Sequence, residues 1–242
     1  MKWLTNFSFR KLFANKKVAV FAGAVCTNIP EGKTYCDHIE EQLFPLQIWG
    51  KNYNAVKTRP RDKEYDVWRI IAQKNNTKVT LSSPLNQTFT LNAGEFKEIS
   101  TTESFQITAD NPVMVGQFMV GSQLVYSKAD YGDPSYIMNV PYEQYRTSYD
   151  FLVPVSYDEN YVTVITPKNN EIKLDGTVIN QATFKNLGSG EYKYGYLDLG
   201  KAEAAHNITA QKPVGLWGYG FAHNVSYGYP IGLDLKRINN TN

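Results

Sequence analysis

Short apolar runs that follow turns dominate the pattern of hydrophobic and polar positions. The clearest are residues 18–21, 113–120 and 214–219, and each is rich in β-branched and aromatic residues. Because these runs are too short for helices, we interpret them as buried strands. Other stretches alternate polar and apolar residues between turns, which is typical of a small β-sandwich. One helical turn is expected at residues 40–43, after Asp37, and no other helix is predicted.

Internal repetition is the second signal. ITADNPV at residues 107–113 recurs as ITAQKPV at 208–214, and LFANKKV at 12–18 is a looser copy. Upstream, VTLSSP at residues 79–84 matches VTVITP at 162–167. Such self-similarity is the signature of a repeated structural unit. We therefore predict about two and a half copies of one β-unit.

These patterns predict an all-β fold of tandem antiparallel β-sandwich-like units built from an internal repeat. Residues 1–48 would hold a partial first repeat, with terminal strands and a loop between Cys26 and Cys36. Residues 49–144 and 145–242 would each form one unit, and residues 122–144 would be a long Tyr-rich surface connection. A first strand without partners of its own must pair within the chain or with a neighbouring molecule.

Composition supports this picture and excludes several function classes. The chain has 242 residues, of which 42% are hydrophobic and 14% aromatic, with 17 tyrosines. A net charge of +2 argues against nucleic acid as a partner. Two cysteines and three histidines predict no zinc or iron–sulfur site, and we expect no metal and no cofactor.

Compartment signals point outside the cell. Cys26 and Cys36 lie ten residues apart in a Pro- and Gly-containing segment, which suits a small disulfide loop, the alternative being two unrelated reduced cysteines. We find no apolar run long enough to cross a membrane and no signal sequence. Asn-x-Ser/Thr triplets, weak support for secretion, begin at Asn6, Asn75, Asn86, Asn207, Asn224 and Asn239. Together these features suggest a fragment of a longer secreted or surface protein.

One string of residues resembles a known family. Residues 36–45 read CDHIEEQLFP and are followed by Trp49-Gly50-Lys51; residues 18–23, 66–72 and 219–230 add weaker matches. The string is similar to the N-terminal domain of the IgGFc-binding protein family, found in secreted and surface proteins. The resemblance implies extracellular binding or adhesion, without catalysis.

Candidate catalytic groups carry little weight. His38, next to Cys36, would need a free thiolate to form a nucleophilic pair, and we favour a bracing role in the loop. His206 and His223 are isolated and make a poor metal site. Six carboxylates near the middle of the chain could in principle serve a glycosidase, and two of them a Ca²⁺ ion, but turn-rich acids are usually solvent groups. They are Asp130, Asp133, Glu143, Asp150, Asp158 and Glu159.

Two further motifs have plain structural interpretations. Gly188-Ser189-Gly190 and Asp175-Gly176 are typical of hairpin turns. The basic run at residues 57–63 is expected to be a solvated hairpin tip.

Tyrosines are the strongest candidates for recognition, because Tyr offers a rigid apolar face with a polar tip. We expect Trp49, Trp68 and Trp217 in the core and several loop tyrosines on the surface. The predicted ligand-binding residues are Tyr126, Tyr131, Tyr136, Tyr142, Tyr227 and Tyr229.

The sequence therefore predicts a secreted or surface-displayed binding module that recognises a glycan or glycoprotein, with Tyr-rich loops at residues 122–144 and 222–230. It is expected to have no membrane insertion and no enzymatic activity. The alternative is a structural assembly unit that self-associates, with the first strand pairing in trans. A carbohydrate-active enzyme is the third hypothesis.

Overall fold

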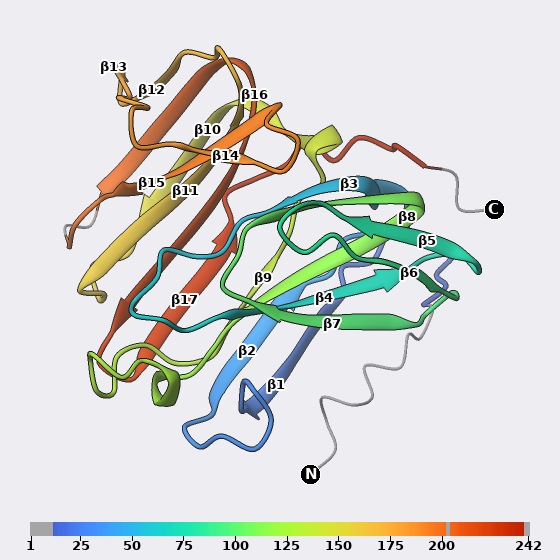
Figure 1. Ribbon diagram of the computed structural model, residues 1–242, viewed down its shortest axis with the longest axis horizontal. Coiled ribbons are helices and arrows are strands. Elements are labelled where there is room, and N and C mark those ends of the chain that lie inside the picture. The colour runs from blue at the N-terminus through green and yellow to red at the C-terminus, as the bar shows by residue number, and fades with distance from the viewer. Residues whose placement is uncertain (1–11, 202–203, 240–242) are drawn as a thin grey trace.

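The chain folds into three antiparallel sheets that form two curled units and a hairpin (Figure 1). The structure, a computed structural model, describes residues 12–201 and 204–239. It has no α-helix in those ranges, so the all-β prediction is confirmed. The part of the predicted first strand at residues 1–11, with the triplet at Asn6, lies outside the described residues. Three short 3-10 turns punctuate the strands: η1 (Leu46–Ile48), η2 (Ser122–Leu124) and η3 (Tyr142–Gln144).

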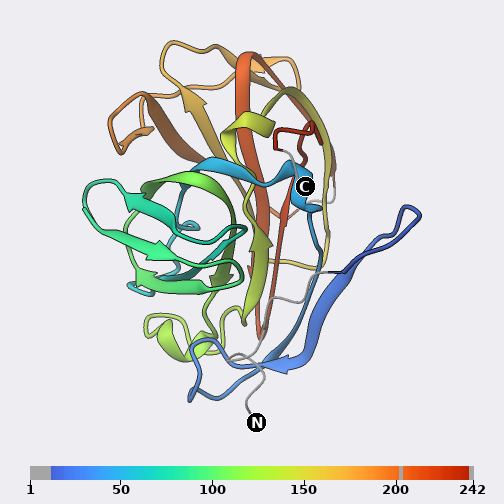
Figure 2. The ribbon, with the colours of Figure 1, turned by 90° about the vertical axis from the view of Figure 1, so that its right-hand side faces the viewer.

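The N-terminal hairpin consists of β1 (Phe21–Thr27) and β2 (Asp37–Gln42). The expected helical turn at residues 40–43 is therefore wrong, because most of that segment pairs with β1 instead. Cys26 and Cys36 form a disulfide across the base of the connecting loop, which confirms that prediction. Ile39 turns inward and is buried, whereas Glu40 beside it faces solvent. Figure 2 shows the hairpin running along one side of the molecule.

The first unit is a seven-stranded sheet organised around one long strand, β8. Its first half pairs with β3 and β5, and its second half pairs with β4 and β9. The sheet curls into two layers, and β8 contributes one half to each layer. The core between the layers contains Trp68 and Phe105. The strands are β3 (Gly50–Ala55), β4 (Asp66–Ala72), β5 (Thr77–Leu81), β6 (Thr88–Leu91), β7 (Phe96–Thr101), β8 (Phe105–Met119) and β9 (Ser135–Met138).

The second unit repeats this arrangement around β16, in an eight-stranded sheet. The first half of β16 pairs with β10 and β12, and its second half pairs with β11 and β17. The strands are β10 (Arg146–Val153), β11 (Glu159–Pro167), β12 (Ile172–Leu174), β13 (Thr177–Val178), β14 (Lys185–Leu187), β15 (Tyr192–Asp198), β16 (Ala204–Ala222) and β17 (Val225–Pro230).

The two long strands bend at matching places. In β8 the register with β3 shifts before Val113, and in β16 the register with β10 shifts before Val214. A bulge lets a strand pass from one layer to the other, and proline is tolerated there because it has no N–H to donate. Tyr53 donates from its hydroxyl to the Val113 carbonyl at 2.6 Å, and Tyr149 does the same to Val214 at 2.6 Å.

These bends lie in the two copies of the repeated segment, at residues 107–113 and 208–214. The predicted equivalence of residues 79–84 and 162–167 as copies of one repeat segment is wrong, however. β5 contacts the first half of β8, whereas β11 contacts the second half of β16, so the two pieces take different places. The wider repeat and the unit boundaries at 49–144 and 145–242 remain predictions.

Hydrophobic packing joins the two units into one body. A cluster between them combines Val56, Met119 and Ile137 of the first unit with Trp217 and Phe221 of the second. This explains why the second halves of β8 and β16 are buried on both faces, as continuous apolar runs predict. Trp49, Trp68 and Trp217 are all buried, as expected.

The last described residues return to the first unit. The Asn239 side chain donates to the carbonyls of Leu46 and Trp49, each at 2.7 Å. The Lys236 amide donates to the Gln144 side chain, which donates in turn to the Lys236 carbonyl at 2.6 Å. This C-terminal strap, residues 231–239, links the second unit to the beginning of the first.

Candidate functional site

The predicted Tyr-rich loop at residues 122–144 is not one exposed loop. β9 lies in its middle and pairs with β8, and much of the segment is buried. Tyr131 is only 4% exposed and packs on Phe221 of the second unit, so its expected surface position is wrong. Tyr136 stacks on Phe118 at 4.5 Å. Tyr126 is 79% exposed, as predicted for a surface loop.

Tyr142 has a different setting from these three. It is half-buried in the 3-10 turn η3 and stacks on Tyr192 with ring centroids 5.6 Å apart. The structure therefore does not bring Tyr126, Tyr131, Tyr136 and Tyr142 together on one face. Burial accounts for this, because three of the four rings pack against other aromatic rings.

Tyr227 and Tyr229 do lie together. They belong to β17 rather than to a loop, so the expected loop at residues 222–230 is also wrong. Their rings are half-buried and stacked, with centroids 6.0 Å apart and 24° between the ring planes. Tyr157 adds a third ring, 4.5 Å from that of Tyr227. We call Tyr157, Tyr227 and Tyr229 the tyrosine platform.

Glycines of β16 let the platform lie flat on the sheet. Gly218 is the register partner of Tyr229, and Gly220 that of Tyr227. A Cβ atom on Gly218 would lie 2.9 Å from Cε1 of Tyr229, and one on Gly220 would lie 2.5 Å from Cε1 of Tyr227. Real Cβ atoms do not approach so closely, so only glycine permits this stacking of rings on backbone.

Hydrogen bonds hold the platform rings in place. Tyr227 donates to the Asn160 side chain at 2.8 Å, and Tyr229 donates to the Leu152 carbonyl at 2.9 Å. Burial raises the pKa of Tyr229 to about 12, and burial followed by the neighbouring Tyr229 raises the pKa of Tyr227 still further. Both phenols are therefore neutral at physiological pH. The platform presents preorganised, uncharged aromatic faces.

The basic run at residues 57–63 is not a solvated tip. It belongs to the connection between β3 and β4, at residues 56–65, which we call the junction loop. The Arg59 amide donates to the Tyr219 hydroxyl at 2.8 Å, and Tyr196 donates to the Lys57 carbonyl at 2.9 Å. The loop is thus hydrogen-bonded to the second unit and lies between the units.

Buried charges inside the junction loop neutralise one another. Lys57 lies 3.2 Å from Glu64 and 3.6 Å from Asp66, and all three side chains are at most 3% exposed. Arg61 lies 3.7 Å from Glu64 and donates to the Tyr131 and Val120 carbonyls. Burial by itself would raise the pKa of Glu64, but Lys57, the backbone donors and Arg61 outweigh it and hold that pKa below its usual value.

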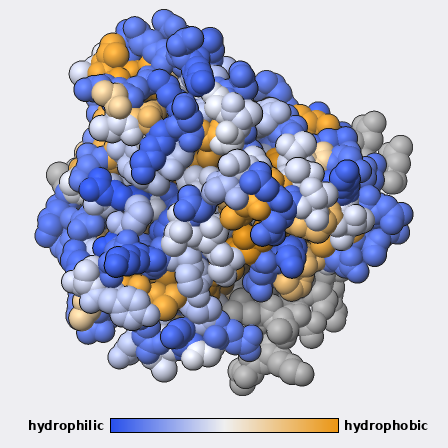
Figure 3. All heavy atoms as spheres, in the orientation of Figure 1, coloured by the Kyte–Doolittle hydropathy of each residue, from blue (hydrophilic) through white to orange (hydrophobic). Residues whose placement is uncertain are grey.

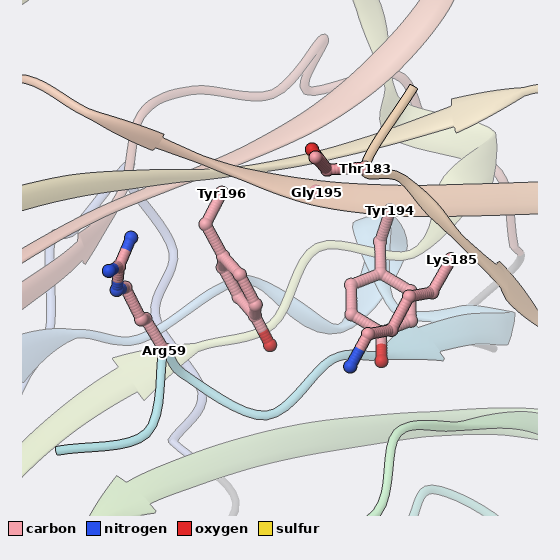
Figure 4. A pocket seen from close by; sticks show the side chains of 6 residues that line it. All are labelled: Arg59, Thr183, Lys185, Tyr194, Gly195 and Tyr196. Atoms are coloured by element: carbon pink, nitrogen blue, oxygen red, sulfur yellow. The ribbon is translucent and has the colours of Figure 1, made fainter. Parts of the chain in front are cut away.

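A small pocket opens beside the junction loop (Figure 4). Its volume is about 250 Å³, and its walls are Arg59, Thr183, Lys185, Tyr194, Gly195 and Tyr196. The sequence did not indicate this pocket, because its residues come from three separate segments. The only sequence signal was the alternation of tyrosines at 192, 194 and 196 along β15.

Two of the candidate acids form exposed ion pairs with lysines. Asp158 pairs with Lys201 at 2.7 Å and Glu159 with Lys128 at 3.0 Å. The others have different surroundings: Asp130 is exposed before β9, Asp133 is buried near Arg61, Glu143 accepts from Asn52, and Asp150 accepts from Asn207. Over residues 12–201 and 204–239, no group of three or more His, Cys, Asp or Glu is placed to hold a metal ion.

The histidines have local partners. His38 lies 3.6 Å from Glu40 on the hairpin, and His223 forms an isolated bridge with Tyr131. We expected His206 to have no carboxylate nearby, and this is wrong. Its Nδ1 lies 2.7 Å from Asp175 in the predicted hairpin turn. That contact joins the β12–β13 hairpin to β16.

Exposed apolar side chains are scattered on the face seen in Figure 3, between mostly hydrophilic ones. Leu152 and Val155, near the platform, are 54% and 62% exposed. On the hairpin, Phe21 is 60% and Val25 is 87% exposed. In the part of the chain described, no helix is long and apolar enough to cross a membrane.

Comparison with known proteins gives one strong family match. The family described as IgGFc binding protein matches residues 11–220. The human IgGFc-binding protein is 26% identical over 235 residues, which cover 96% of this chain and 4% of the human protein. The chain thus spans a small part of that relative.

Two solved structures show weak likeness. An anti-sigma factor domain-containing protein is 9% identical and covers 74% of this chain and 81% of its own, with a TM-score of 0.21. Another, from Clostridium clariflavum, is 11% identical with coverages of 75% and 83% and a TM-score of 0.23. Likeness at this level carries no argument about fold or function.

Proposed function

Because this chain belongs to the IgGFc binding protein family, we propose that it is an extracellular, non-catalytic binding module that recognises a glycan or glycoprotein. The human relative carries binding of antibody Fc in its name. This chain corresponds to 4% of that protein, so its own ligand is argued from its surface. The disulfide between Cys26 and Cys36 supports an oxidising, extracellular compartment.

The tyrosine platform is the observation that carries this proposal. Tyr229 lies flat on glycine backbone, so its outer face can stack against the apolar face of a sugar ring, beside Tyr157, which packs on Tyr227. The hydroxyls of Tyr227 and Tyr229 are already hydrogen-bonded to Asn160 and Leu152, so the two side chains lose little conformational entropy when a ligand binds. The phenolic oxygens keep lone pairs that can accept hydrogen bonds from sugar hydroxyls.

Neutral platform rings imply a particular salt dependence. Stacking and hydrogen bonding between uncharged groups are not screened by salt, whereas exposed ion pairs are. Binding of a neutral sugar at the platform is therefore expected to keep its affinity between 50 and 500 mM NaCl.

A glycan and glycoprotein array with the disulfide-intact protein tests the proposal. We expect selective hits that are lost in Tyr227→Ala and Tyr229→Ala and retained in Tyr227→Phe, which keeps the aromatic face. Tyr126→Ala is the matched control, because it removes an exposed tyrosine outside the platform. Thermal melts identify any variant that fails to fold. Hits that survive both alanine variants in folded protein would refute the platform as the site.

A structural assembly unit is the second candidate, and the outer edge of β1 favours it. Among the described residues β1 pairs only with β2, and Phe21 and Val25 on β1 are exposed. An open edge with apolar side chains can accept a strand from another molecule. Light scattering tests this role: we expect an oligomer that Val25→Lys dissociates, and a monomer at all concentrations would exclude it.

A further inference from the structure

Asparagines that begin Asn-x-Ser/Thr triplets differ in how the fold uses their side-chain amides. The amide nitrogen Nδ2 carries two hydrogens, and an N-linked glycan replaces one of them. An asparagine that donates both hydrogens to the protein therefore loses a hydrogen bond when it is glycosylated. The triplet asparagines among the described residues are Asn75, Asn86, Asn207, Asn224 and Asn239.

Two of these asparagines donate both hydrogens. Nδ2 of Asn207 donates to the Tyr149 carbonyl at 3.2 Å and to the Asp150 carboxylate at 2.7 Å, which joins β16 to β10. Nδ2 of Asn239 donates to two carbonyls near the start of the first unit, each at 2.7 Å. Both side chains are half-buried. A glycan at either position would break a hydrogen bond between distant segments.

Asn75 leaves its amide nitrogen unused. It is exposed in the turn between β4 and β5, and its Oδ1 accepts the Ala93 amide at 3.0 Å. A glycan leaves that oxygen unchanged. Among residues 12–201 and 204–239, Nδ2 of Asn75 has no acceptor. Glycosylation of Asn75 would therefore break no hydrogen bond within this part of the chain.

Asn86 and Asn224 each use one amide hydrogen. Both are exposed, Asn86 between β5 and β6 and Asn224 between β16 and β17. Nδ2 of Asn86 donates to the Pro84 carbonyl at 3.3 Å, and Nδ2 of Asn224 lies 3.1 Å from Nε2 of His223. A glycosylated amide retains one N–H, so these local contacts can be kept. Their φ values of 49° and 55° are typical of asparagine in turns.

We propose that Asn75, Asn86 and Asn224 are acceptor sites for N-linked glycans, whereas Asn207 and Asn239 are not. The co-reactant is a lipid-linked glycosyl diphosphate. A bond forms between Nδ2 and the anomeric carbon of the sugar, and the bond from that carbon to the diphosphate breaks. The diphosphate leaves, and Nδ2 loses one proton. The proposal rests on the extracellular compartment of the proposed function and is independent of its ligand.

Site-resolved mass spectrometry tests the proposal on the full chain, secreted by human cells behind a heterologous leader peptide. Peptide N-glycosidase in heavy-oxygen water converts each glycosylated asparagine to labelled aspartate. In secreted protein that melts cooperatively, we expect label at the three acceptors in most molecules. We expect it at Asn207 and Asn239 in fewer than about one molecule in ten, because chains that cannot form native hydrogen bonds are retained and degraded.

Each outcome at a triplet decides that position. An unlabelled acceptor would overturn the assignment there, and label above one in ten at Asn207 or Asn239 would overturn the hydrogen-bond argument. Thr88→Ala is the matched control, because Thr88 is exposed and its loss removes the triplet while the Asn86 amide stays in place. Label that persisted at Asn86 in this variant would come from deamidation and would overturn that site.

A second measurement needs no glycan. In protein made in a bacterial periplasm, replacement of Asn by Asp keeps the side-chain oxygen and removes the Nδ2 donor. Asn207→Asp and Asn239→Asp should each lower Tm by about 2–4 °C or more, whereas Asn75→Asp should leave it within about 1 °C. Equal losses would overturn the distinction between used and unused amides. A blank glycan array would refute the platform's ligand and leave both measurements unchanged, so the two failures are distinguishable.

Discussion

Replacing Glu64 with Gln tests whether buried charge stabilises the junction between the units. The carboxylate of Glu64 faces Lys57 at 3.2 Å and Arg61 at 3.7 Å, and its side chain is 1% exposed. Its oxygens also accept the Arg61 and Asp62 amides at 2.9 and 2.7 Å. Glutamine has nearly the same shape and keeps one acceptor oxygen, so the main loss is the negative charge.

Removing one partner of a buried ion pair costs about 3–5 kcal/mol, because the other charge stays buried without compensation. In Glu64→Gln, Lys57 would keep Asp66 as its acidic neighbour, and Arg61 would keep only the electrostatic attraction of Asp66 and Asp133. We expect the free energy of unfolding to fall by about 3 kcal/mol. With a urea m-value of about 3 kcal/mol/M, the midpoint would fall by about 1 M.

Urea denaturation followed by tryptophan fluorescence measures this loss. Glu171→Gln is the matched control, because the Glu171–Lys173 pair is 3.6 Å long and both side chains are more than 40% exposed. Exposed pairs contribute about 0–1 kcal/mol. Adding Lys57→Met to Glu64→Gln is expected to recover part of the stability, since it removes one unpaired charge.

The dependence on pH follows from the same contacts. The pKa of folded Glu64 lies below its ordinary value of 4.5, so its contribution is complete above that pH and is lost as pH falls through the folded pKa. The gap between the parent protein and Glu64→Gln should therefore close in acid. A variant within 1 kcal/mol of the parent protein at pH 7 would refute this account of the junction.

Further predictions concern the core, the disulfide and one buried acid. Trp68→Ala should cost about 3–5 kcal/mol in urea denaturation, because the ring is fully buried on Phe105; a loss below 1 kcal/mol would contradict this. Tyr131→Ala should cost about 3 kcal/mol, which an exposed ring would not. Reduction of Cys26–Cys36 should cost about 2–3 kcal/mol, and an unchanged melt would contradict that loss. Burial, then Asp37, raises the pKa of Asp133 to about 6, so stability should fall from pH 4 to 6, and Asp133→Asn melts should lack that part of the slope.

Strands were predictable where local chemistry decides them. The runs at 113–120 and 214–219 are apolar throughout because both faces of β8 and β16 are covered. Asp175 and Gly176 have positive φ values of 50° and 80°, as a tight hairpin turn requires, and their residue types indicate it. The disulfide loop was equally visible from the spacing of Cys26 and Cys36.

Contacts between distant segments were not predictable. The sequence suggested that Lys57 and Arg61 are solvent-exposed. Arg61 instead donates to the carbonyls of Val120 and Tyr131, which lie about 60 and 70 positions further along the chain. Tyr131 looked exposed in the sequence because its partner, Phe221, lies 90 positions away. Residues 40–42 looked helical because the strand that pairs with them lies beyond the disulfide loop.

In the candidate site, too, the sequence indicated residues but not the contacts between distant segments. Tyr227 and Tyr229 were named from composition, but their stacking depends on Gly218 and Gly220 across the β16–β17 register. The pocket at Arg59 was missed altogether, since it exists only where the junction loop meets β14 and β15.

The C-terminal strap has a mechanical consequence. Asn239 is bonded to the carbonyls of Leu46 and Trp49, close to the point where the chain leaves the β1–β2 hairpin. Tension applied between the hairpin and the strap would load these few hydrogen bonds before it reached β8 or β16. The long strands would stay unloaded while these bonds held, so we expect the strap to act as a mechanical clamp on the two units.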